Sequence, residues 1–168
     1  MYRNGGPTNI NFARFLGYVP TAVAMLKGSE DYPDISGVVR FYDTAYGTVV
    51  FAEAVGLPFA EGICDSPIFG FHIHEGGKCG DRDGGAFSEA GDHFDPNGCT
   101  HPYHAGDMPP LMGANGIAFS AFLTSRFDVG EIIGRTVVIH GSPDDFVSDP
   151  SGNSGERIAC GEIVSVRR

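Results

Sequence analysis

The chain lacks several features that mark common classes of binding protein. It contains no tryptophan, and its 11 lysine and arginine residues are outnumbered by 21 aspartate and glutamate residues, giving a formal net charge of −10. Nucleic acids and anionic membrane surfaces are bound through positive charge, so this composition argues against both partners. No run of the sequence approaches the roughly 20 apolar residues that a membrane-spanning helix needs.

A C-x-x-C pair, a clear signal peptide and helical periodicity are also absent. The four cysteines are Cys64, Cys79, Cys99 and Cys160. Their spacing excludes a zinc ribbon or a thioredoxin-type motif, and their even number fits two disulfides or none. Pro20 interrupts the short apolar run near the N-terminus, and no small-residue cleavage site follows Leu26. The compartment stays open, with a cytoplasmic location favoured over export.

Glycine and proline are abundant, with 25 and 11 residues, and they divide the chain into short segments. Frequent turn residues are typical of short strands and not of long helices. Strand character is found in residues 21–26, 35–42, 47–55, 69–75, 116–124, 135–140 and 157–166. The pattern predicts an all-β sandwich or barrel of about eight antiparallel strands, one domain over residues 20–168, after a flexible N-terminal arm over residues 1–19.

Two long segments interrupt this pattern, residues 76–110 and 141–156. The first is rich in glycine, aspartate and proline, and it contains three histidines and two cysteines. Structureless loops of such length in a compact domain are usually functional or disordered, and the histidines favour function. We therefore expect the two loops to form a site that the strands hold in place.

Histidines supply the clearest chemical pattern. His72 and His74 form an H-x-H pair in a predicted strand, which places both imidazoles on one face, where they can hold one metal ion. A pair of half-exposed strand histidines would give the same pattern. His140 ends another predicted strand, either as a further ligand or as a surface histidine.

The first long loop contains a second pattern, H-x-x-H-x-x-D, formed by His101, His104 and Asp107. Two imidazole nitrogens and one carboxylate oxygen can provide three of the four ligands of a tetrahedral zinc ion. His93 lies between the H-x-H pair and this trio in the sequence. It can therefore link the two groups, although a plain loop histidine is the alternative.

Five stretches together resemble the copper/zinc superoxide dismutase family. They read FHIHE over residues 71–75, GDHFDP over 91–96, HAGD over 104–107, IGRTVVIH over 133–140 and GERIACG over 155–161. Their order and the extent of the similarity, from about residue 21 to 166, make the resemblance specific. It implies a Greek-key β-sandwich, since that family has a sandwich architecture, with the two long loops forming the metal site.

The resemblance also implies two metal ions, copper and zinc. The implied copper ligands are His72, His74, His93 and His140, and the implied zinc ligands are His93, His101, His104 and Asp107. His93 would then bridge both metals as an imidazolate. Imidazole nitrogens suit both ions, and copper accepts a four-nitrogen arrangement.

Three further roles follow from the resemblance. Asp144 would join a copper histidine to a zinc histidine through hydrogen bonds, the alternative being an aspartate in a loop turn. Arg157 would dock superoxide, the alternative being an ion pair with Glu156. Cys79 and Cys160 would form a disulfide; for Cys64 and Cys99 the family pattern gives no guide, and we expect a second disulfide because both lie in loops beside the site.

Two departures from the family pattern stand out. His101 and His104 are closer together than in the eukaryotic members, and the loop over residues 142–156 contains no lysine. With its net charge of −10, the chain should therefore be a slower or less salt-sensitive enzyme.

The expected function is dismutation of superoxide to oxygen and hydrogen peroxide, with Arg157 and His93 as catalytic residues. The alternative is a non-catalytic copper and zinc protein, a buffer or delivery domain on the same fold. Superoxide anion is the expected small-molecule partner, and a homodimer is one assembly that the resemblance allows.

Overall fold

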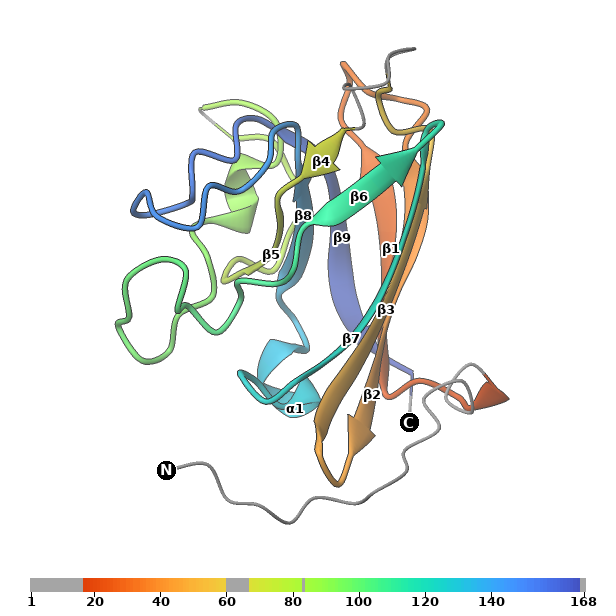
Figure 1. Ribbon diagram of the computed structural model, residues 1–168, viewed down its shortest axis with the longest axis vertical. Helices are drawn as coiled ribbons and strands as arrows, with labels where there is room; N and C mark the ends of the chain where they lie inside the picture. Colours follow the sequence, from red (N-terminus) through yellow and green to blue (C-terminus); the bar gives the residue numbers. More distant parts are fainter. Residues whose placement is uncertain (1–16, 60–66, 83, 167–168) are drawn as a thin grey trace.

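The computed structural model describes residues 17–59, 67–82 and 84–166. Nine strands in this part of the chain form one antiparallel sheet in the order β4-β6-β7-β3-β2-β1-β9-β8-β5 (Figure 1). They are β1 (Ala22–Gly28), β2 (Ser36–Thr44), β3 (Gly47–Val55), β4 (Ile68–Phe69), β5 (Phe71–His74), β6 (Leu111–Ala114), β7 (Ile117–Thr124), β8 (Thr136–His140) and β9 (Arg157–Ser165). The helical elements of the described residues are short, η2 (Ser88–Ala90) and α1 (Val129–Ile132). The predicted all-β fold is confirmed.

The two end strands of this order, β4 and β5, are consecutive in the chain and are separated only by Gly70. β4 pairs with β6 and β5 pairs with β8, so the sheet closes on itself into a nearly complete barrel. At Gly70 a side chain has no room, because an added Cβ would lie 2.7 Å from the side chain of Ser154. The predicted strand 69–75 is thus two strands, each paired with a different neighbour.

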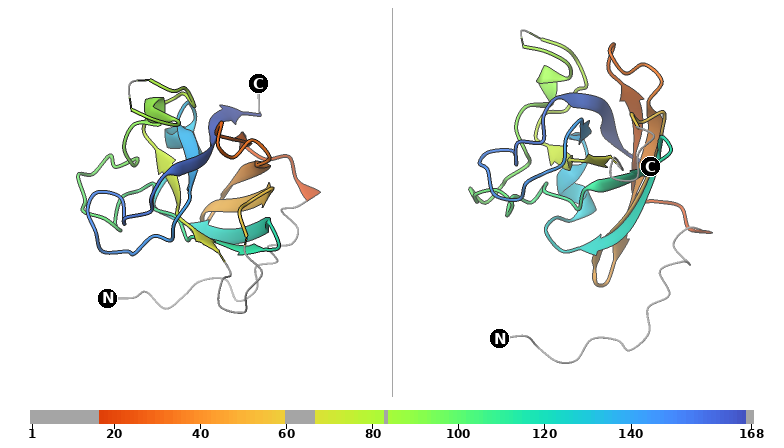
Figure 2. Two further views of the ribbon diagram at one scale, coloured as in Figure 1. Left: turned by 90° about the horizontal axis from the view of Figure 1, so that it is seen from above. Right: turned by 45° about the horizontal axis from the view of Figure 1, so that its top comes forward.

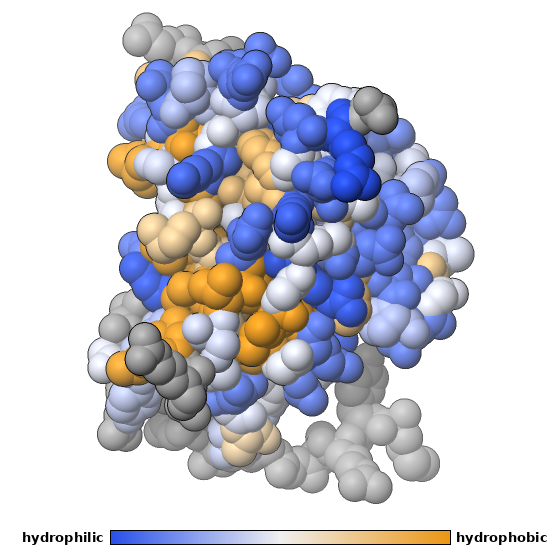
Figure 3. Space-filling model, turned by 180° about the vertical axis from the view of Figure 1, so that it is seen from behind, coloured by the Kyte–Doolittle hydropathy of each residue, from blue (hydrophilic) through white to orange (hydrophobic). Residues whose placement is uncertain are grey.

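Alternation of side chains places the core inside the barrel. In β1, Ala22, Ala24 and Leu26 are buried while Met25 is exposed, as expected for a strand with one face toward water. Exposed apolar side chains also occur on the outer surface, among them Val164 of β9 and Phe119 of β7. In the view from behind, apolar side chains form patches among hydrophilic ones (Figure 3).

Two elements were not predicted from the sequence. β6 lies where a loop was expected to lead directly into the next strand, and α1 follows β7 as a single helical turn. The predicted N-terminal arm lies almost entirely outside the described residues and stays a prediction.

The two predicted long loops lie side by side on one side of the barrel in all three ribbon views (Figures 1 and 2). The segment after β5 is drawn in green, and the segment between β8 and β9 is drawn in blue. The first begins at β5 and the second runs from β8 to β9, and these three strands are neighbours at one end of the sheet order. The barrel therefore brings together the two parts of the sequence that carry the candidate site.

Candidate metal centre

The six histidines are all buried, each with 7% or less of its surface exposed. β5 supplies His72 and His74, β8 ends with His140, and the loop after β5 supplies His93, His101 and His104. Six buried imidazoles in one place are costly to desolvate unless their nitrogens are bound to partners. Their burial therefore points to a site and not to surface histidines.

The H-x-H pair has the orientation that the sequence predicted. Phe71 and Ile73 are part of the hydrophobic core, and His72 and His74 alternate with them along β5. The imidazole of His140 approaches His74 closely, with the two Nε2 atoms 3.2 Å apart. The adjoining loop is held along β5 by backbone hydrogen bonds from Ile73 to Gly106 and from Phe94 to Ile73.

A first group of possible metal ligands contains His72, His74, His93 and His140, whose ligand atoms all lie within 4.8 Å of one another. One ring nitrogen of three of these histidines is held from outside the group: Nε2 of His72 by Asp144, Nδ1 of His74 by the Gly91 carbonyl, and Nδ1 of His140 by the Gly155 carbonyl. Such partners fix the tautomer and leave the other nitrogen as a lone pair facing inward. Nδ1 of His72 and Nε2 of His93 are buried and have no hydrogen-bond partner.

A second group contains His93, His101, His104 and Asp107, again with ligand atoms within 4.8 Å of one another. The Nδ1 atoms of His101 and His104 are buried without a hydrogen-bond partner, and they lie 3.2 and 3.3 Å from Oδ2 of Asp107. Nδ1 of His93 lies 2.8 Å from Oδ1 of the same carboxylate. Convergent nitrogens and one carboxylate fit a cation such as zinc.

His93 is the residue that the two groups share. Its Nδ1 faces the second group through Asp107, and its Nε2 is the buried atom without a partner in the first group. The rings of His93 and His72 are close, with centroids 4.0 Å apart. This position between the groups is the one that the sequence suggested for a linking histidine.

Burial keeps three histidines of the first group neutral, namely His72, His74 and His140. Desolvation lowers the pKa of His140 to about 3 and also lowers the pKa of His72 and of His74. At His74, the neighbouring His93 and His140 lower the pKa further. A neutral imidazole is the form that binds a metal ion. The pKa of Asp107 is lowered although burial opposes this, because His93 donates a hydrogen bond to its carboxylate.

Asp144 joins the two groups from the second long loop. Its Oδ2 lies 2.7 Å from Nε2 of His72, and its Oδ1 lies 2.8 Å from Nε2 of His101. Burial would raise the pKa of this carboxyl, but the hydrogen bonds from His72, the Phe146 amide and His101 lower it well below its usual range. Gly152, with φ of 64°, must lack a side chain, because a Cβ there would lie 2.2 Å from Oδ1 of Asp144.

Arg157 lies at the start of β9, beside the first group. The β8–β9 register shifts between Ile139 and His140, and this irregularity places Arg157 opposite His140. Its Nη1 donates to the Phe87 carbonyl at 2.7 Å and its Nη2 to the Gly91 carbonyl at 2.6 Å. Partial burial lowers the pKa of the guanidinium, which still carries its charge near neutrality.

Arg157 is one of the residues that line a surface cavity of about 570 Å³. Asp31, Asp92 and Glu156 line the same cavity, so its lining contains three acidic residues and one arginine. Glu156 accepts a hydrogen bond from the Tyr32 hydroxyl, whereas the hydrogen bonds of Arg157 go to backbone carbonyls. These contacts do not match the alternative of an Arg157–Glu156 ion pair.

The disulfide between Cys79 and Cys160 is present, with the Cα atoms 5.7 Å apart and a sequence separation of 81. It ties the first loop to β9, and its sulfurs lie in a small cluster with Phe87 and Ala90. In the chain-entropy model such a loop closure stabilises the fold by about 4–5 kcal/mol. Cys99 is exposed. Its expected partner, Cys64, lies outside the described residues, so the second bridge stays a prediction.

Two residues beside the second group were missed in the sequence. Oδ1 of Asp149 accepts the backbone N–H of His101 at 2.7 Å, which gives the second loop a further contact with the first. Arg126, just after β7, donates to backbone carbonyls of the first loop. Backbone carbonyls and amides leave no trace in the residue pattern, so no signal in the sequence could have identified these partners.

Comparisons with known proteins agree with this geometry. The family model described as copper/zinc superoxide dismutase matches residues 35–163. The chain belongs to the copper/zinc superoxide dismutase family. The residues of the match include both histidine groups, Asp144 and Arg157.

Several superoxide dismutases are similar over most of their length. Superoxide dismutase [Cu-Zn] 1 of Aquifex aeolicus is 37% identical over 145 residues, which cover 76% of this chain and 79% of that protein. The Deinococcus radiodurans enzyme is 34% identical over 151 residues (79% of each chain), and enzyme A of Xenopus laevis is 36% identical over 157 residues (84% of this chain and 95% of that one). The solved structure of the Brucella abortus enzyme superposes with a TM-score of 0.70 at 25% identity, covering 84% of this chain and 98% of that chain.

Family members bind copper and zinc, and the two histidine groups give this superoxide dismutase chain donor sets that fit both ions. Every ligand in these groups is an imidazole nitrogen or a carboxylate oxygen. As for the membrane, none of the helices in the described part of the chain is long and apolar enough to cross one.

Proposed function

We propose that this chain converts two superoxide ions and two protons to oxygen and hydrogen peroxide, at a copper site that shares His93 with a zinc site. The proposed copper ligands are His72, His74, His93 and His140, and the proposed zinc ligands are His93, His101, His104 and Asp107. The observation that carries the proposal is the position of His93, which has one ring nitrogen in each group.

Copper, when bound, supplies the electron transfer by alternating between its oxidised and reduced states, and zinc supplies a fixed charge that holds its ligands. The protein's own contribution begins with the tautomers of its histidines. Asp144 and the carbonyls of Gly91 and Gly155 hold the outer nitrogens of His72, His74 and His140. The inner nitrogens are therefore available without any rearrangement.

Arg157 binds the superoxide anion in this proposal. Two of its N–H groups are fixed on the carbonyls of Phe87 and Gly91, which leaves its other N–H groups for a ligand. The Gly91 carbonyl also accepts from Nδ1 of His74, so one backbone group orients both a proposed copper ligand and the anion-binding arginine. Preorganised donors of this kind stabilise negative charge as it develops.

His93 moves a proton at Nε2. This atom has no hydrogen-bond partner within the protein, whereas Nδ1 is held on the side of Asp107. Nε2 can therefore take up a proton in one half of the cycle and release it to the reduced oxygen species in the other, while Nδ1 keeps the ring in place.

The alternative of a non-catalytic metal buffer or delivery domain is less well supported. Copper delivery favours soft, exchangeable ligands, and the two described groups contain neither cysteine nor methionine. The deciding assay measures how fast superoxide disappears in the presence of the chain loaded with copper and zinc. Rapid dismutation is expected; stoichiometric binding of both metals without dismutation would support the alternative instead.

A homodimer is the proposed assembly. Met25 and Val164, exposed on the neighbouring strands β1 and β9, support a homodimer, which light scattering on purified protein tests. A cytoplasmic location is opposed by the Cys79–Cys160 disulfide, because such bonds persist mainly in oxidising compartments. Cell fractionation tests the location.

Thiol counting under denaturing, non-reducing conditions tests the bridge between Cys64 and Cys99: two free thiols would exclude it.

A further inference from the structure

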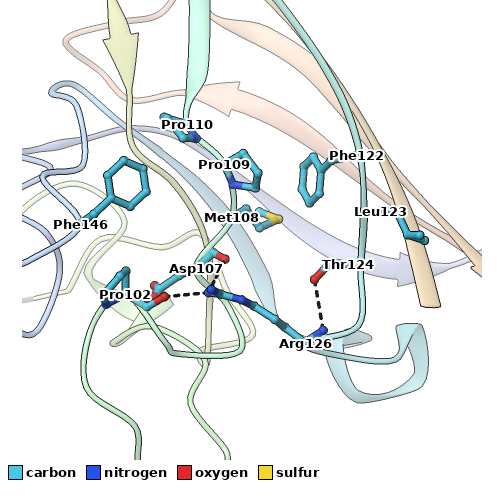
Figure 4. A pocket seen from close by; sticks show the side chains of 10 residues that line it. All are labelled: Pro102, Asp107, Met108, Pro109, Pro110, Phe122, Leu123, Thr124, Arg126 and Phe146. Atoms are coloured by element: carbon cyan, nitrogen blue, oxygen red, sulfur yellow. Dashed lines mark hydrogen bonds between the residues drawn. The ribbon is translucent and has the colours of Figure 1, made fainter. Parts of the chain in front are cut away.

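We propose that Arg126 is a positioning residue for the zinc site, acting through the backbone of the loop that carries three of the zinc ligands. Its Nη1 lies within hydrogen-bond distance of three carbonyl oxygens: 2.8 Å from that of Pro102, 3.3 Å from that of His104 and 3.2 Å from that of Asp107. Figure 4 shows the side chain of Arg126 reaching from the end of β7 to the segment with Pro102 and Asp107.

The three acceptors are placed so that one side chain, the guanidinium of Arg126, holds the whole ligand segment. His104 and Asp107 are proposed zinc ligands themselves, and Pro102 directly follows the third, His101. An Nη1 amino group has two hydrogens, so the three carbonyl oxygens must share them, with attraction to the charge of the guanidinium holding all three. The backbone at each of the three ligands is thereby fixed relative to a single point.

That point is itself anchored on the barrel. The backbone N–H of Arg126 donates to Oγ1 of Thr124 at 3.1 Å, and the next residue, Phe127, is buried in the core. Oγ1 of Thr48, from β3, donates to the Phe127 carbonyl at 3.0 Å. The guanidinium therefore extends from a segment that is tied to two strands, β3 and β7.

The first part of this ligand segment, around His101 and Pro102, has no backbone hydrogen bond to a strand among the described residues. Residues 96–100, which lead into it, are all exposed, and the ligands His101 and His104 are separated by only two residues. Within the loop, backbone bonds join Tyr103 to Thr100 and Asp107 to His104, which are local turns. Backbone bonds at Gly106 and Met108 tie the end of the segment to β5. Arg126 adds a link from the β7 side of the barrel, and this link reaches back to the carbonyl of Pro102.

This inference rests on the zinc ligands proposed above, and the test separates the two. Zinc affinity is measured on the metal-free full-length chain by competition with a chromogenic chelator, for the unsubstituted protein and for Arg126→Gln, Arg126→Lys and Arg40→Gln. Arg40 is a matched control, because it is an arginine of the same barrel that pairs with Glu53. The Co(II) absorption spectrum, with cobalt in place of zinc, reports the ligand geometry.

Arg126→Gln should weaken zinc binding by about tenfold, the lower end of the range for residues that support metal ligands, and change the Co(II) spectrum. The zinc affinity of Arg126→Lys should lie between those of the unsubstituted protein and Arg126→Gln, because a single ammonium group keeps the charge but reaches less far. Arg40→Gln should leave both readouts unchanged.

The inference is overturned if Arg126→Gln binds zinc as tightly as the unsubstituted chain. This holds even if the melting temperature of the metal-free variant falls, since Arg126 would then stabilise only the fold. If Arg126→Gln does not fold, the same criterion applies to Arg126→Lys. If the unsubstituted chain binds no zinc, the ligand assignment fails and this inference with it. If it does bind zinc and the variants bind equally well, only this inference fails.

Discussion

His72 and His101 are bound to the two oxygens of one carboxylate, that of Asp144. His72 belongs to the first group of ligands and His101 to the second, so the second loop connects the two groups independently of His93. The low pKa of Asp144 means that it accepts hydrogen bonds from both histidines over the whole neutral range. Both rings then present Nδ1 to the interior.

Replacing Asp144 by asparagine should weaken the binding of both metals. An amide has one oxygen, so one histidine would face an N–H group in place of an acceptor and would lose its preferred tautomer. We expect losses of about 10- to 100-fold in copper and zinc affinity, measured by chelator competition. Asp145→Asn, at an exposed residue that binds only its own loop, should have a smaller effect. Equal losses in the two variants would contradict a direct role of Asp144.

Arg157→Glu should reduce the catalytic rate by about tenfold or more without changing the metal content, because the side chain acts on the anion and not on the metal. Pulse radiolysis gives the rate, and atomic absorption gives the metal content. Arg157→Lys, which keeps the charge but cannot reach both carbonyls in the same way, should retain part of the rate. An unaltered rate in Arg157→Glu would move Arg157 to a purely structural role.

The salt dependence of the reaction should differ from that of an enzyme with a positively charged opening. Three carboxylates, those of Asp31, Asp92 and Glu156, line the cavity beside Arg157, and the second loop contains no lysine. Salt screens repulsion as well as attraction, so the rate constant should stay level or rise between about 0.01 and 0.15 M ionic strength. Asp31→Asn should raise the rate at low salt. A steep decrease with salt in the unsubstituted enzyme would be inconsistent with this account.

The metal-free chain should lose stability as the pH falls from about 6.5 toward about 3. Burial lowers the pKa of His140 to about 3, from an ordinary value of 6.5, and His72 and His74 are shifted in the same direction. Within this window the unfolded chain binds more protons than the folded chain, so acid favours unfolding. Melting temperatures measured across the window should fall, and less steeply in His140→Gln. An identical slope in this variant would argue against the shift of His140.

The candidate ligands of the metal centre could be recognised in the sequence because their chemistry belongs to side chains, and their assignment to copper and zinc stays a prediction. His72 and His74 share a face of any strand, and His101, His104 and Asp107 are close along the chain. The disulfide Cys79–Cys160 followed from the family resemblance and is confirmed. The resemblance also suggested the contacts of Asp144 with two histidines. The contacts made by Arg157 and Arg126 were not predictable, since their acceptors are backbone carbonyls.

The fold class and most of the strands were predictable, and the prediction failed where elements are short. β6 reads Leu-Met-Gly-Ala after two prolines, and only its pairing with β4 and β7 makes it a strand. α1 has four residues, too few to show a helical period. The amide of Asp128 donates to the Glu131 carboxylate, a capping box that begins the helix. The division of strand 69–75 at Gly70 depends on barrel closure, which no local pattern contains.

The bridging position of His93 is tested most directly by the zinc affinity of His93→Ala, measured beside its copper affinity by chelator competition. Because His93 has one ring nitrogen in each group, the account predicts that both affinities fall together and that dismutation is lost. His104→Ala is the control, since it belongs to the second group alone and should weaken zinc more than copper. Zinc affinity that stays normal in His93→Ala would contradict the shared histidine and the two-metal site built on it.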